Sequence, residues 1–361
     1  MGGNNTKKSA VRSVKKFFLL SFLCVLPLCL LSEWLRGFPA AIHFSTFSNN
    51  CRSRNVTILL WYWPFNRPYS LQGDVCWNLY RIAHCRLVDQ RSLFSSADVV
   101  VFHNKELIMG RQKLPLDLPR PQGQRWAWMS LEAPAYSGNL GRYANVFNMT
   151  ITYRKDADIT VPYGELLLKE AKGQLLEDVS VNKESLACWV VSNYRSQHKR
   201  SQVYKELNAT VPVEVYGRWT KKPLPSSALL RTISRCYFYL AFENSVAREY
   251  ITEKLWRNAY QGGAVPVVLG PPLSDYKAVA PPNSFIHVDE FASVNELGKY
   301  LQQLAQDKKR YTEYFTWTQK WKVKLYTDWR ERLCKICLQY NTLPQQKVYS
   351  DLNAWVNANN T

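Results

Sequence analysis

Short, unbroken apolar runs recur along this chain and constrain its fold more than any other feature. Apolar residues follow one another in these runs instead of alternating with polar ones, which is typical of strands buried on both faces of a parallel sheet. The runs lie at residues 55–63, 97–102 and 126–131 in the first half of the chain, and at 186–192, 211–216, 237–242, 264–269 and 284–288 in the second half. We therefore predict an α/β fold in which each half of the chain builds a parallel sheet.

Helical patterns separate several of these strands. The clearest helix opens at Ser293, with Glu296 three residues later as in a capping box, and then places on one face Leu297, Tyr300, Leu301 and Leu304. Residues 170–184 are rich in Lys, Gly, Glu and Asp and predict a hinge. We expect two Rossmann-like domains facing a cleft, at residues 54–175 and 185–325, followed by a C-terminal tail at 326–361.

The N-terminal part of the chain carries a membrane signal. Five basic residues precede an apolar run from Phe17 to Leu31, which as a helix would span roughly 22 Å. A cleaved signal peptide and a buried core helix are alternatives, but no small-residue cleavage site follows the run and Trp34 suits a membrane interface. We therefore favour a signal-anchor, with a cytoplasmic tail at residues 1–16, a transmembrane helix at 17–35 and a stem at 36–53. The short span points to the Golgi membrane, with single-pass type II topology and a lumenal catalytic region.

An oxidising lumen would make the cysteines after residue 35 candidates for disulfide bonds. Zinc binding is the alternative, but only Cys334 and Cys337 have the spacing of a zinc knuckle. N-glycosylation is predicted at three sequons, Asn55, Asn148 and Asn208. The net charge of +19 favours an anionic partner, and on charge alone nucleic acid, anionic lipid, a nucleotide-sugar and a sialylated glycan all stay open.

The stretch from residue 236 to 270, CYFYLAFENSVAREYITEKLWRNAYQGGAVPVVLG, is the most informative about chemistry. It predicts a strand, a polar turn, a helix, a glycine pair and a second buried strand. Because ligands gather at the carboxyl ends of parallel strands, residues 243–245 are site candidates. A helix beginning near Tyr250 would present its free backbone N–H groups and Lys254 to a diphosphate. The alternative is that Glu253 and Lys254 lie on a solvated helix face.

Recognisable segments extend well beyond this stretch. FENSVAREYITEKLWRNA and GAVPVVLGPP in the stretch itself are joined by WPF at 63–65, RSLFSSADVVVFH at 91–103, WMSLEAP at 128–134, TYRKDADITVPYG at 152–164, CWVVSNY at 188–194 and YTDWRERLCKICLQY at 326–340. With these segments the chain resembles the α-1,3-fucosyltransferases of glycosyltransferase family 10 from about residue 55 to its C-terminus. The resemblance implies a GT-B fold of two Rossmann-like domains and an inverting reaction. It also implies GDP-fucose as donor substrate and no obligatory metal or other cofactor.

The resemblance assigns roles to individual residues. Glu132 follows a predicted strand and matches the family's catalytic glutamate, with Ala133 where the family usually has Ser. It would deprotonate the acceptor hydroxyl as general base. The alternative is a strand-end glutamate in a surface salt bridge. Donor binding is implied for Tyr163, Val190, Ser192, Asn193, Arg200, Tyr239, Asn244, Tyr250, Glu253 and Lys254, of which Arg200 and Lys254 would contact the diphosphate.

Acceptor binding is implied for Arg67 and Lys105. The family's HHRD/E segment corresponds here to the tetrad from His103 to Glu106, so the basic residue linked with type 2 chain preference is a lysine, which lacks arginine's planar fork. The alternative for the tetrad is an ordinary polar loop. The implied acceptors are sialylated or neutral lactosamine glycans on glycoproteins and glycolipids.

Disulfide pairing is also implied by the resemblance, which joins Cys188 to Cys236, and Cys76 and Cys85 to Cys334 and Cys337. The latter two bridges would tie the C-terminal tail back to the first domain. A local bridge between Cys334 and Cys337 is an alternative, and Cys51 either stays free or links two chains in a homodimer.

Two other patterns suggest a metal site, and we reject both. Asp156 and Asp158 form a D-x-D pattern that binds manganese in another glycosyltransferase fold, but this family carries YRxDSD at the same place in a metal-independent fold. The five histidines are scattered without metal-ligand spacing. The second functional hypothesis is a membrane-tethered carbohydrate-binding protein without turnover. Nucleic acid is not an expected partner, because the anchor and the sequons place the chain away from it.

Overall fold

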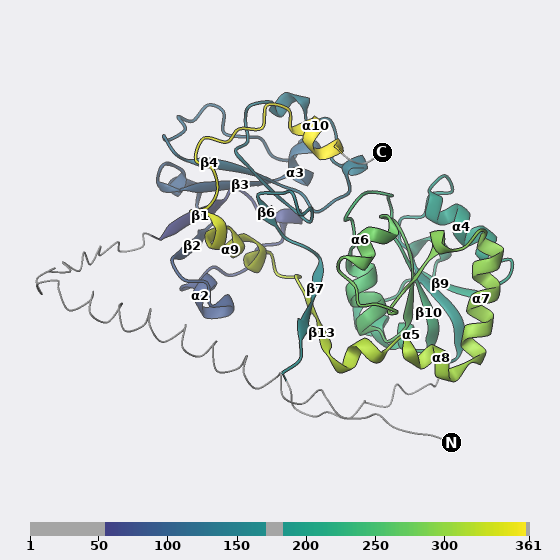
Figure 1. Cartoon of the computed structure of the whole chain (residues 1–361). Helices are drawn as coiled ribbons and strands as arrows, with labels where there is room; N and C mark the ends of the chain where they lie inside the picture. The colour runs from purple at the N-terminus through teal and green to yellow at the C-terminus, as the bar shows by residue number, and fades with distance from the viewer. Residues whose placement is uncertain (1–54, 171–182, 359–361) are drawn as a thin grey trace, which may run out of the picture. The chain divides into compact units, whose positions relative to one another are not determined.

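The computed structural model describes residues 55–170 and 183–358 of the chain (Figure 1). The predicted anchor at residues 17–35, the stem at 36–53 and nearly all of the predicted hinge at 170–184 lie outside these residues. Within the two described ranges, no helix combines the length and the apolar character that crossing a bilayer requires.

The first sheet has six parallel strands in the order β2-β1-β3-β4-β5-β6. Their bounds are Val56–Leu60 for β1, Cys85–Val88 for β2, Val99–His103 for β3, Arg125–Met129 for β4, Met149–Thr152 for β5 and Ile159–Thr160 for β6. Both faces of the sheet carry apolar clusters, as unbroken apolar runs require. The runs predicted β1, β3 and β4 but missed the other three strands, because these are short or contain polar residues that become buried.

The second sheet has five parallel strands in the order β12-β11-β10-β8-β9. Every apolar run of the second half became one of them, and their bounds are Ser185–Val190 for β8, Val213–Tyr216 for β9, Cys236–Phe242 for β10, Val265–Leu269 for β11 and Ile286–His287 for β12. The helices α4 (Lys199–Leu207) and α7 (Val294–Gln306) cover one face, and α5 (Ser226–Ser234) and the π-helix η6 (Lys254–Gln261) cover the other (Figure 1). The parallel sheets and helical layers confirm the α/β fold class.

The helix α7 begins where its cap was predicted. The hydroxyl of Ser293 accepts a hydrogen bond from the backbone N–H of Glu296 at 3.2 Å. The carboxylate of Glu296 accepts from Ala292 instead of Ser293, so the reciprocal half of the capping box is displaced by one residue. Leu297, Leu301 and other residues of the predicted face are fully buried, and they anchor the helix on the sheet.

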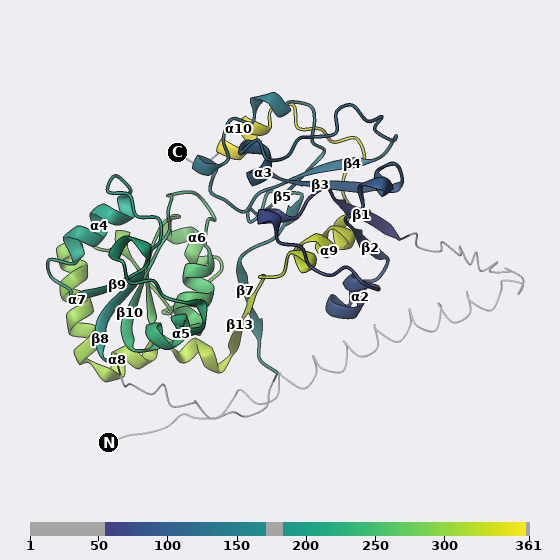
Figure 2. The ribbon, with the colours of Figure 1, turned by 180° about the vertical axis from the view of Figure 1, so that it is seen from behind.

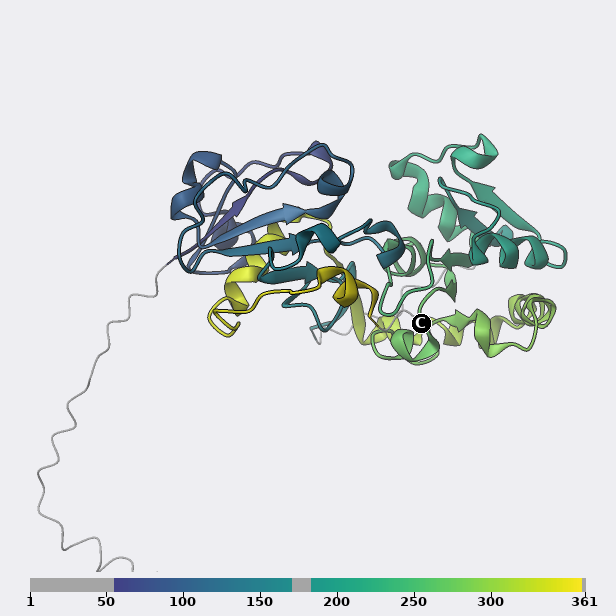
Figure 3. The ribbon, with the colours of Figure 1, turned by 90° about the horizontal axis from the view of Figure 1, so that it is seen from above.

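The other α-helices have between five and eleven residues. They are α2 (Val75–Tyr80), α3 (Asn104–Ile108), α6 (Leu273–Lys277), α8 (Lys308–Glu313), α9 (Trp329–Gln339) and α10 (Leu352–Asn357). The segments α9 and α10 close the described chain and lie on the first sheet, as the yellow trace shows from above (Figure 3). Leu333 and Ile336 of α9 belong to the same apolar cluster as β1, β3 and β4.

An antiparallel strand pair carries the chain from the first sheet to the second and back. β7 (Gly164–Leu168) follows the first sheet, and β13 (Trp321–Leu325) pairs with it along its whole length (Figure 2). The pair packs closely against η6, since a Cβ atom added to Gly164 would lie 2.6 Å from the Trp256 ring. Only glycine fits at that position.

Three disulfide bonds join cysteines that lie far apart in the sequence. They pair Cys76 with Cys334, Cys85 with Cys337, and Cys188 with Cys236. This is the pairing that the resemblance implied. It excludes the local bridge between Cys334 and Cys337, and it uses the sulfur atoms that a zinc ion would need. The first two bridges fasten α9 to α2 and β2 of the first sheet.

The two bridges to α9 close nearly the same loop, with sequence separations of 258 and 252 residues. While the bridge between Cys85 and Cys337 is intact, the other bridge closes only a short additional loop. We therefore predict that Cys76→Ala/Cys334→Ala lowers the free energy of unfolding by about 3 kcal/mol. Removing the second bridge as well opens the long loop and should lower the free energy of unfolding by about 5 kcal/mol more. Urea unfolding of the full chain under non-reducing conditions measures both steps. Equal losses at the two steps would contradict the shared loop.

Candidate functional site

A small pocket lies at the carboxyl ends of β10 and β11. Residues 243–246 follow β10, and Leu269 and Gly270 end and follow β11. The start of α4 completes the lining with His198, Lys199 and Arg200. The parallel register of the two strands brings their ends to one edge, as the sequence predicted. A Cβ atom at Gly270 would lie 2.9 Å from the Glu243 side chain, so a glycine at this position makes room for that side chain.

Arg200 is a buried cation in this pocket, with 5% of its surface exposed. One guanidinium nitrogen donates to the carbonyl of Asn193 at 2.5 Å, while Nε has no hydrogen-bond partner and the side chain forms no ion pair within the described part of the chain. Burial lowers the pKa of Arg200, yet a guanidinium stays charged at neutral pH. The side-chain oxygen of Asn244 is also unpartnered. Because a buried, unpaired charge is costly, the pocket suits an anionic ligand.

Lys254 is not on a solvated helix face, whereas Glu253 is exposed, so that alternative holds only for Glu253. Its ammonium donates to Glu243 at 2.9 Å, to Thr252 Oγ1 at 2.8 Å and to Glu253 at 3.2 Å. The Glu243 side chain is only 1% exposed, and it also accepts hydrogen bonds from the backbone and hydroxyl of Thr252. Burial alone would lower the pKa of Lys254, but the charges of Glu243 and Glu253 hold it above its ordinary value. All three ammonium hydrogens are used.

The helix after the polar turn begins at Lys254 instead of near Tyr250, which corrects the prediction. Glu249 has a φ of +59°, a backbone conformation that does not continue into a helix. Contacts on both sides hold it there, because its N–H donates to Asp275 at 2.7 Å and its carboxylate accepts from the N–H of Lys155 at 2.9 Å. Tyr250 therefore lies in the non-helical link before the helix.

Tyr250 belongs to an aromatic cluster whose residues come from segments that follow strands of both sheets. Its ring lies 5.1 Å from Tyr153 and 6.3 Å from Tyr163, and Ala133 packs in the same cluster. The hydroxyl of Tyr163 donates to the carbonyl of Leu131 at 2.5 Å. Burial raises the pKa of Tyr163 and of Tyr250 well above the ordinary range, so both hydroxyls stay protonated. The cluster places the segment after β4 against the segment before η6.

Glu132 lies in the segment after β4, beside this cluster. It is half-buried, and its carboxylate accepts no hydrogen bond and forms no ion pair within the described ranges. Its charge acts on the hydroxyls of Tyr163 and Tyr250. The surface salt bridge considered for Glu132 is therefore absent from the described structure. The residue lines a shallow depression together with Trp128, Ser130, Pro134, Ser137, Thr152, Tyr153, Arg154, Trp355 and Val356.

The predicted acceptor tetrad forms the start of α3 and is not a polar loop. His103 ends β3 and contacts Glu106 through its Nδ1 atom at 2.5 Å, with both side chains buried. Glu106 also accepts from the backbone of Phe65 at 2.8 Å, which ties the WPF segment to α3. Lys105 is half-buried and Arg67 is exposed. The structure thus explains the polar tetrad as a connection of which Lys105 alone is not buried.

The other predicted donor residues occupy different surroundings. Val190 ends β8 and is half-buried, and Ser192 and Asn193 are exposed in the turn that follows. Tyr239 has no exposed surface, and its hydroxyl accepts a hydrogen bond from Asn258 at 2.9 Å. The ring is part of the core between β10 and η6 and presents no surface to a ligand in this structure.

The two carboxylates of the D-x-D pattern are both engaged. Asp156 holds the guanidinium of Arg154 through two hydrogen bonds of 2.8 and 2.6 Å. Asp158 accepts from the backbone of Thr150 at 2.9 Å, from Lys347 at 2.7 Å and from Tyr349 at 2.7 Å. These contacts give both carboxylates a structural role.

The predicted sequons differ in their exposure. Asn55 and Asn208 are exposed. Asn148 is half-buried, its side-chain nitrogen donates to the carbonyl of Lys347 at 2.9 Å, and its oxygen accepts from the N–H of Trp126 at 2.9 Å. A glycan on Asn148 would have to break these hydrogen bonds, so the structure argues against that site.

Trp355 is a site residue that the sequence did not indicate. It lies on α10, half-buried, and lines the depression that contains Glu132. Arg154 positions it, since its guanidinium donates to the carbonyl of Trp355 at 2.8 Å and lies 4.3 Å from the indole ring. No motif includes Trp355, and only a tryptophan within a polar tail could have drawn attention to it.

Two family models match nearly the whole described chain. "Fucosyltransferase, N-terminal" matches residues 53–164, and "Glycosyltransferase family 10 (fucosyltransferase) C-term" matches residues 180–355. A solved structure described as α1,3-fucosyltransferase with GDP-fucose has the same fold, with a TM-score of 0.54 at 19% identity over 82% of this chain and 93% of that one.

Curated relatives agree with these matches. Alpha-(1,3)-fucosyltransferase 7 of Bos taurus is 48% identical over 84% of this chain and 86% of its own length. 4-galactosyl-N-acetylglucosaminide 3-alpha-L-fucosyltransferase 9 of Bos taurus is 38% identical over 83% and 82%. The resemblance to α-(1,3)-fucosyltransferase 7, most visible in the segment at residues 326–340, is confirmed. The chain therefore belongs to glycosyltransferase family 10, and within it to the α-(1,3)-fucosyltransferases.

Proposed function

We propose that this enzyme transfers L-fucose from GDP-β-L-fucose, with inversion, to the N-acetylglucosamine of type 2 N-acetyllactosamine glycans in α-1,3 linkage. The acceptors are sialylated or neutral, and with sialylated ones the products are of the sialyl Lewis x type. The names of the relatives and the donor present in the related solved structure support this substrate pair. The observation that carries the proposal is the unpaired, half-buried carboxylate of Glu132 beside the tyrosine cluster.

The chain's own residues supply the acid–base chemistry. The Glu132 carboxylate takes the proton from the acceptor hydroxyl as its oxygen bonds to C1 of fucose. The bond between C1 and the β-phosphate oxygen breaks at the same time, and its electron pair leaves with GDP. Tyr163 and Tyr250 frame the carboxylate with protonated hydroxyls, which cannot compete with it for the acceptor proton. Inversion follows, because one carboxylate acts in a single displacement.

Arg200 is the principal partner that we assign to the leaving pyrophosphate. Its buried Nε and the absence of an ion pair in the described structure leave its charge for an anion, and a fixed cation stabilises the charge that develops on the leaving group. Lys254 contributes differently, since its three hydrogens are already used. A phosphate oxygen would replace the long contact to the exposed Glu253 and leave the pair with Glu243 intact.

The acceptor lies, in this proposal, over the depression around Glu132. Ser130 and Trp355 line it, and an indole ring suits the apolar face of a sugar. Arg67 and Lys105 extend the acceptor side near α3 as basic groups that can contact a sialic acid carboxylate. We also infer that residues 17–35 anchor the enzyme in the Golgi membrane with its catalytic region in the lumen. The three disulfides support an oxidising compartment.

The reaction needs no divalent metal in this proposal. We expect the purified full chain to release GDP and form an α-1,3-fucosylated product from GDP-fucose and sialylated or neutral type 2 lactosamine, at the same rate with and without excess chelator. Type 1 lactosamine, whose N-acetylglucosamine is substituted at the 3-hydroxyl, is the matched control. Loss of activity with chelator would contradict metal independence, and glycan binding without GDP release would support a binding protein instead.

Replacing the proposed base tests the mechanism. Glu132→Gln keeps the size of the side chain but cannot accept the proton, so kcat should fall by about 10² to 10⁴ while GDP binding stays unchanged. Initial rates and calorimetric titration with GDP measure the two effects. Glu206→Gln, an exposed change on α4, is the control. Full activity of Glu132→Gln would remove the assigned role.

Replacing the buried cation tests donor binding. Arg200→Lys keeps the charge but loses the planar fork, and we expect GDP to bind more weakly by about 1.5 to 3 kcal/mol, or roughly 10- to 150-fold in Kd. Titration with GDP measures this loss, and Arg231→Lys on the exposed side of α5 serves as control. Unchanged affinity for GDP together with unchanged KM for the donor would rule out the contact.

A further inference from the structure

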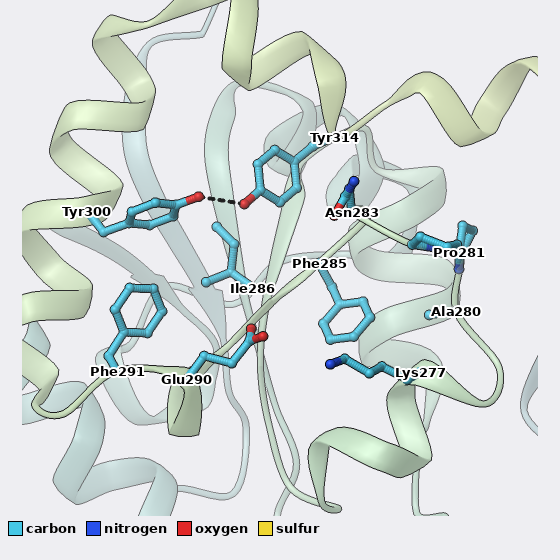
Figure 4. Close-up of a pocket in the computed structure, with 11 residues that line it drawn as sticks. Lys277, Ala280, Pro281, Asn283, Phe285, Ile286, Glu290, Phe291, Tyr300 and Tyr314 are labelled. Carbon is cyan, nitrogen blue, oxygen red and sulfur yellow. Dashed lines mark hydrogen bonds between the residues drawn. The ribbon is translucent and has the colours of Figure 1, made fainter.

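A second and larger hollow lies at the β12 edge of the second sheet (Figure 4). It encloses about 1100 Å³, including the part that is open to solvent. Its walls come from five segments: the end of α6, the loop at residues 280–285, β12 with the residues that follow it, the helix α7, and Tyr314 directly after α8. None of the residues assigned above to the donor, the acceptor or the proton transfer lines it.

The helix α6 separates this hollow from the catalytic site. On one side Asp275 accepts the hydrogen bond from Glu249 that shapes the link before η6. On the other side Lys277 lines the hollow, and the buried Tyr276 ring packs 5.6 Å from Phe285, which also lines it. A ligand in the hollow therefore occupies a site of its own.

Flat apolar surfaces and hydrogen-bonding groups alternate around the hollow. Phe291 packs against Tyr300 with ring centroids 5.2 Å apart, and Phe285 faces them from the other wall (Figure 4). The hydroxyls of Tyr300 and Tyr314 are 2.7 Å apart. Only one hydrogen is needed between two hydroxyls, so the pair keeps one donor for other partners. All four rings are half-buried, which fixes them while one side stays accessible.

The charged groups of the hollow balance each other. Lys277 and Glu290 reach toward one another from opposite walls, yet they form no ion pair in the described residues (Figure 4). One carboxylate oxygen of Glu290 accepts a hydrogen bond from the N–H of His287 at 3.1 Å. The other oxygen has no hydrogen-bond partner among those residues. One ammonium opposed by one carboxylate disfavours a nucleotide or another polyanion. It suits a neutral ligand with hydroxyl groups.

We propose that this hollow is a second carbohydrate site, which binds neutral sugar units of the acceptor chain away from the unit that is fucosylated. A pyranose ring has an apolar face and hydroxyl edges, which match the aromatic walls and the polar groups between them. The inference rests on the proposed function, because its ligand is the glycan class named in a relative's description as a 4-galactosyl-N-acetylglucosaminide. Long acceptors then bind at two places, and short acceptors at one.

Kinetics with acceptors of different length test this site. With the full chain and neutral N-acetyllactosamine chains, we expect Phe291→Ala and Lys277→Ala to raise KM for a hexasaccharide about two- to tenfold. KM for the disaccharide and for GDP-fucose should not change. Lys299→Ala, an exposed lysine of α7 outside the lining, is the matched control. Equal KM changes for both acceptor lengths, or none for either, would overturn the proposal.

A binding experiment on the unaltered chain tests the second site even if one of the variants fails to fold. Saturation-transfer NMR on the unaltered chain with GDP should show transfer to the hexasaccharide, and Lys277→Ala should reduce it. Absence of transfer overturns the second site, and transfer to an extended peptide without glycan, but not to the hexasaccharide, assigns the hollow to a protein partner. If the chain binds the hexasaccharide but does not fucosylate the disaccharide, the proposed function is refuted and the second carbohydrate site is not.

Discussion

The proposed site depends on two charged side chains that stay unpaired although folding removes much of their contact with water. Arg200 is buried without an ion pair, and Glu132 is half-buried without a hydrogen bond to its carboxylate, among the described residues. Each arrangement opposes folding, because an uncompensated charge loses hydration. Two parallel sheets make it tolerable, since apolar clusters on both faces stabilise the strands whose ends carry these residues.

The neighbouring charges show the opposite solution. Lys254 and Glu243 are buried together and satisfy each other and Thr252. Such a pair adds little net stability, but it fixes the direction of the ammonium and the end of β10. A buried charge pair thus orders the turn after β10, and the charge of Arg200 nearby has no ion-pair partner among the described residues. Lys254 has the carboxylate of Glu243 at 2.9 Å, whereas the Arg200 side chain forms no ion pair among the described residues.

The C-terminal segments α9 and α10 pack on the first sheet and bring distant parts of the sequence together around the proposed acceptor site. Two disulfides fix α9, and Arg154 holds the backbone and ring of Trp355 on α10. Asp156 in turn orients Arg154. The D-x-D motif, which in isolation resembles a metal site, is therefore a support for the wall of the depression around Glu132. A local motif acquired its role from a partner some two hundred residues away.

The sequence by itself determined the sheets and the edge at which the site forms. Eight apolar runs predicted eight of the strands, and residues after β4 and β10 were predicted at the carboxyl edge, because burial on both faces demands continuous apolar residues. The family resemblance, carried by motifs at fixed spacing, supplied the activity and the disulfide pairing. These are properties that neighbouring residues encode.

Only the tertiary structure decided how exposed each candidate side chain is and which partners it has. Tyr239 became core because Asn258 of η6 bonds its hydroxyl, and the helix expected near Tyr250 started later because contacts across the chain hold Glu249 at positive φ. Trp355 joined the site through a segment that no motif marks. Exposure, pairing and backbone conformation at these positions depend on residues distant in sequence. Local pattern therefore fixes the elements, and long-range packing fixes what each side chain does.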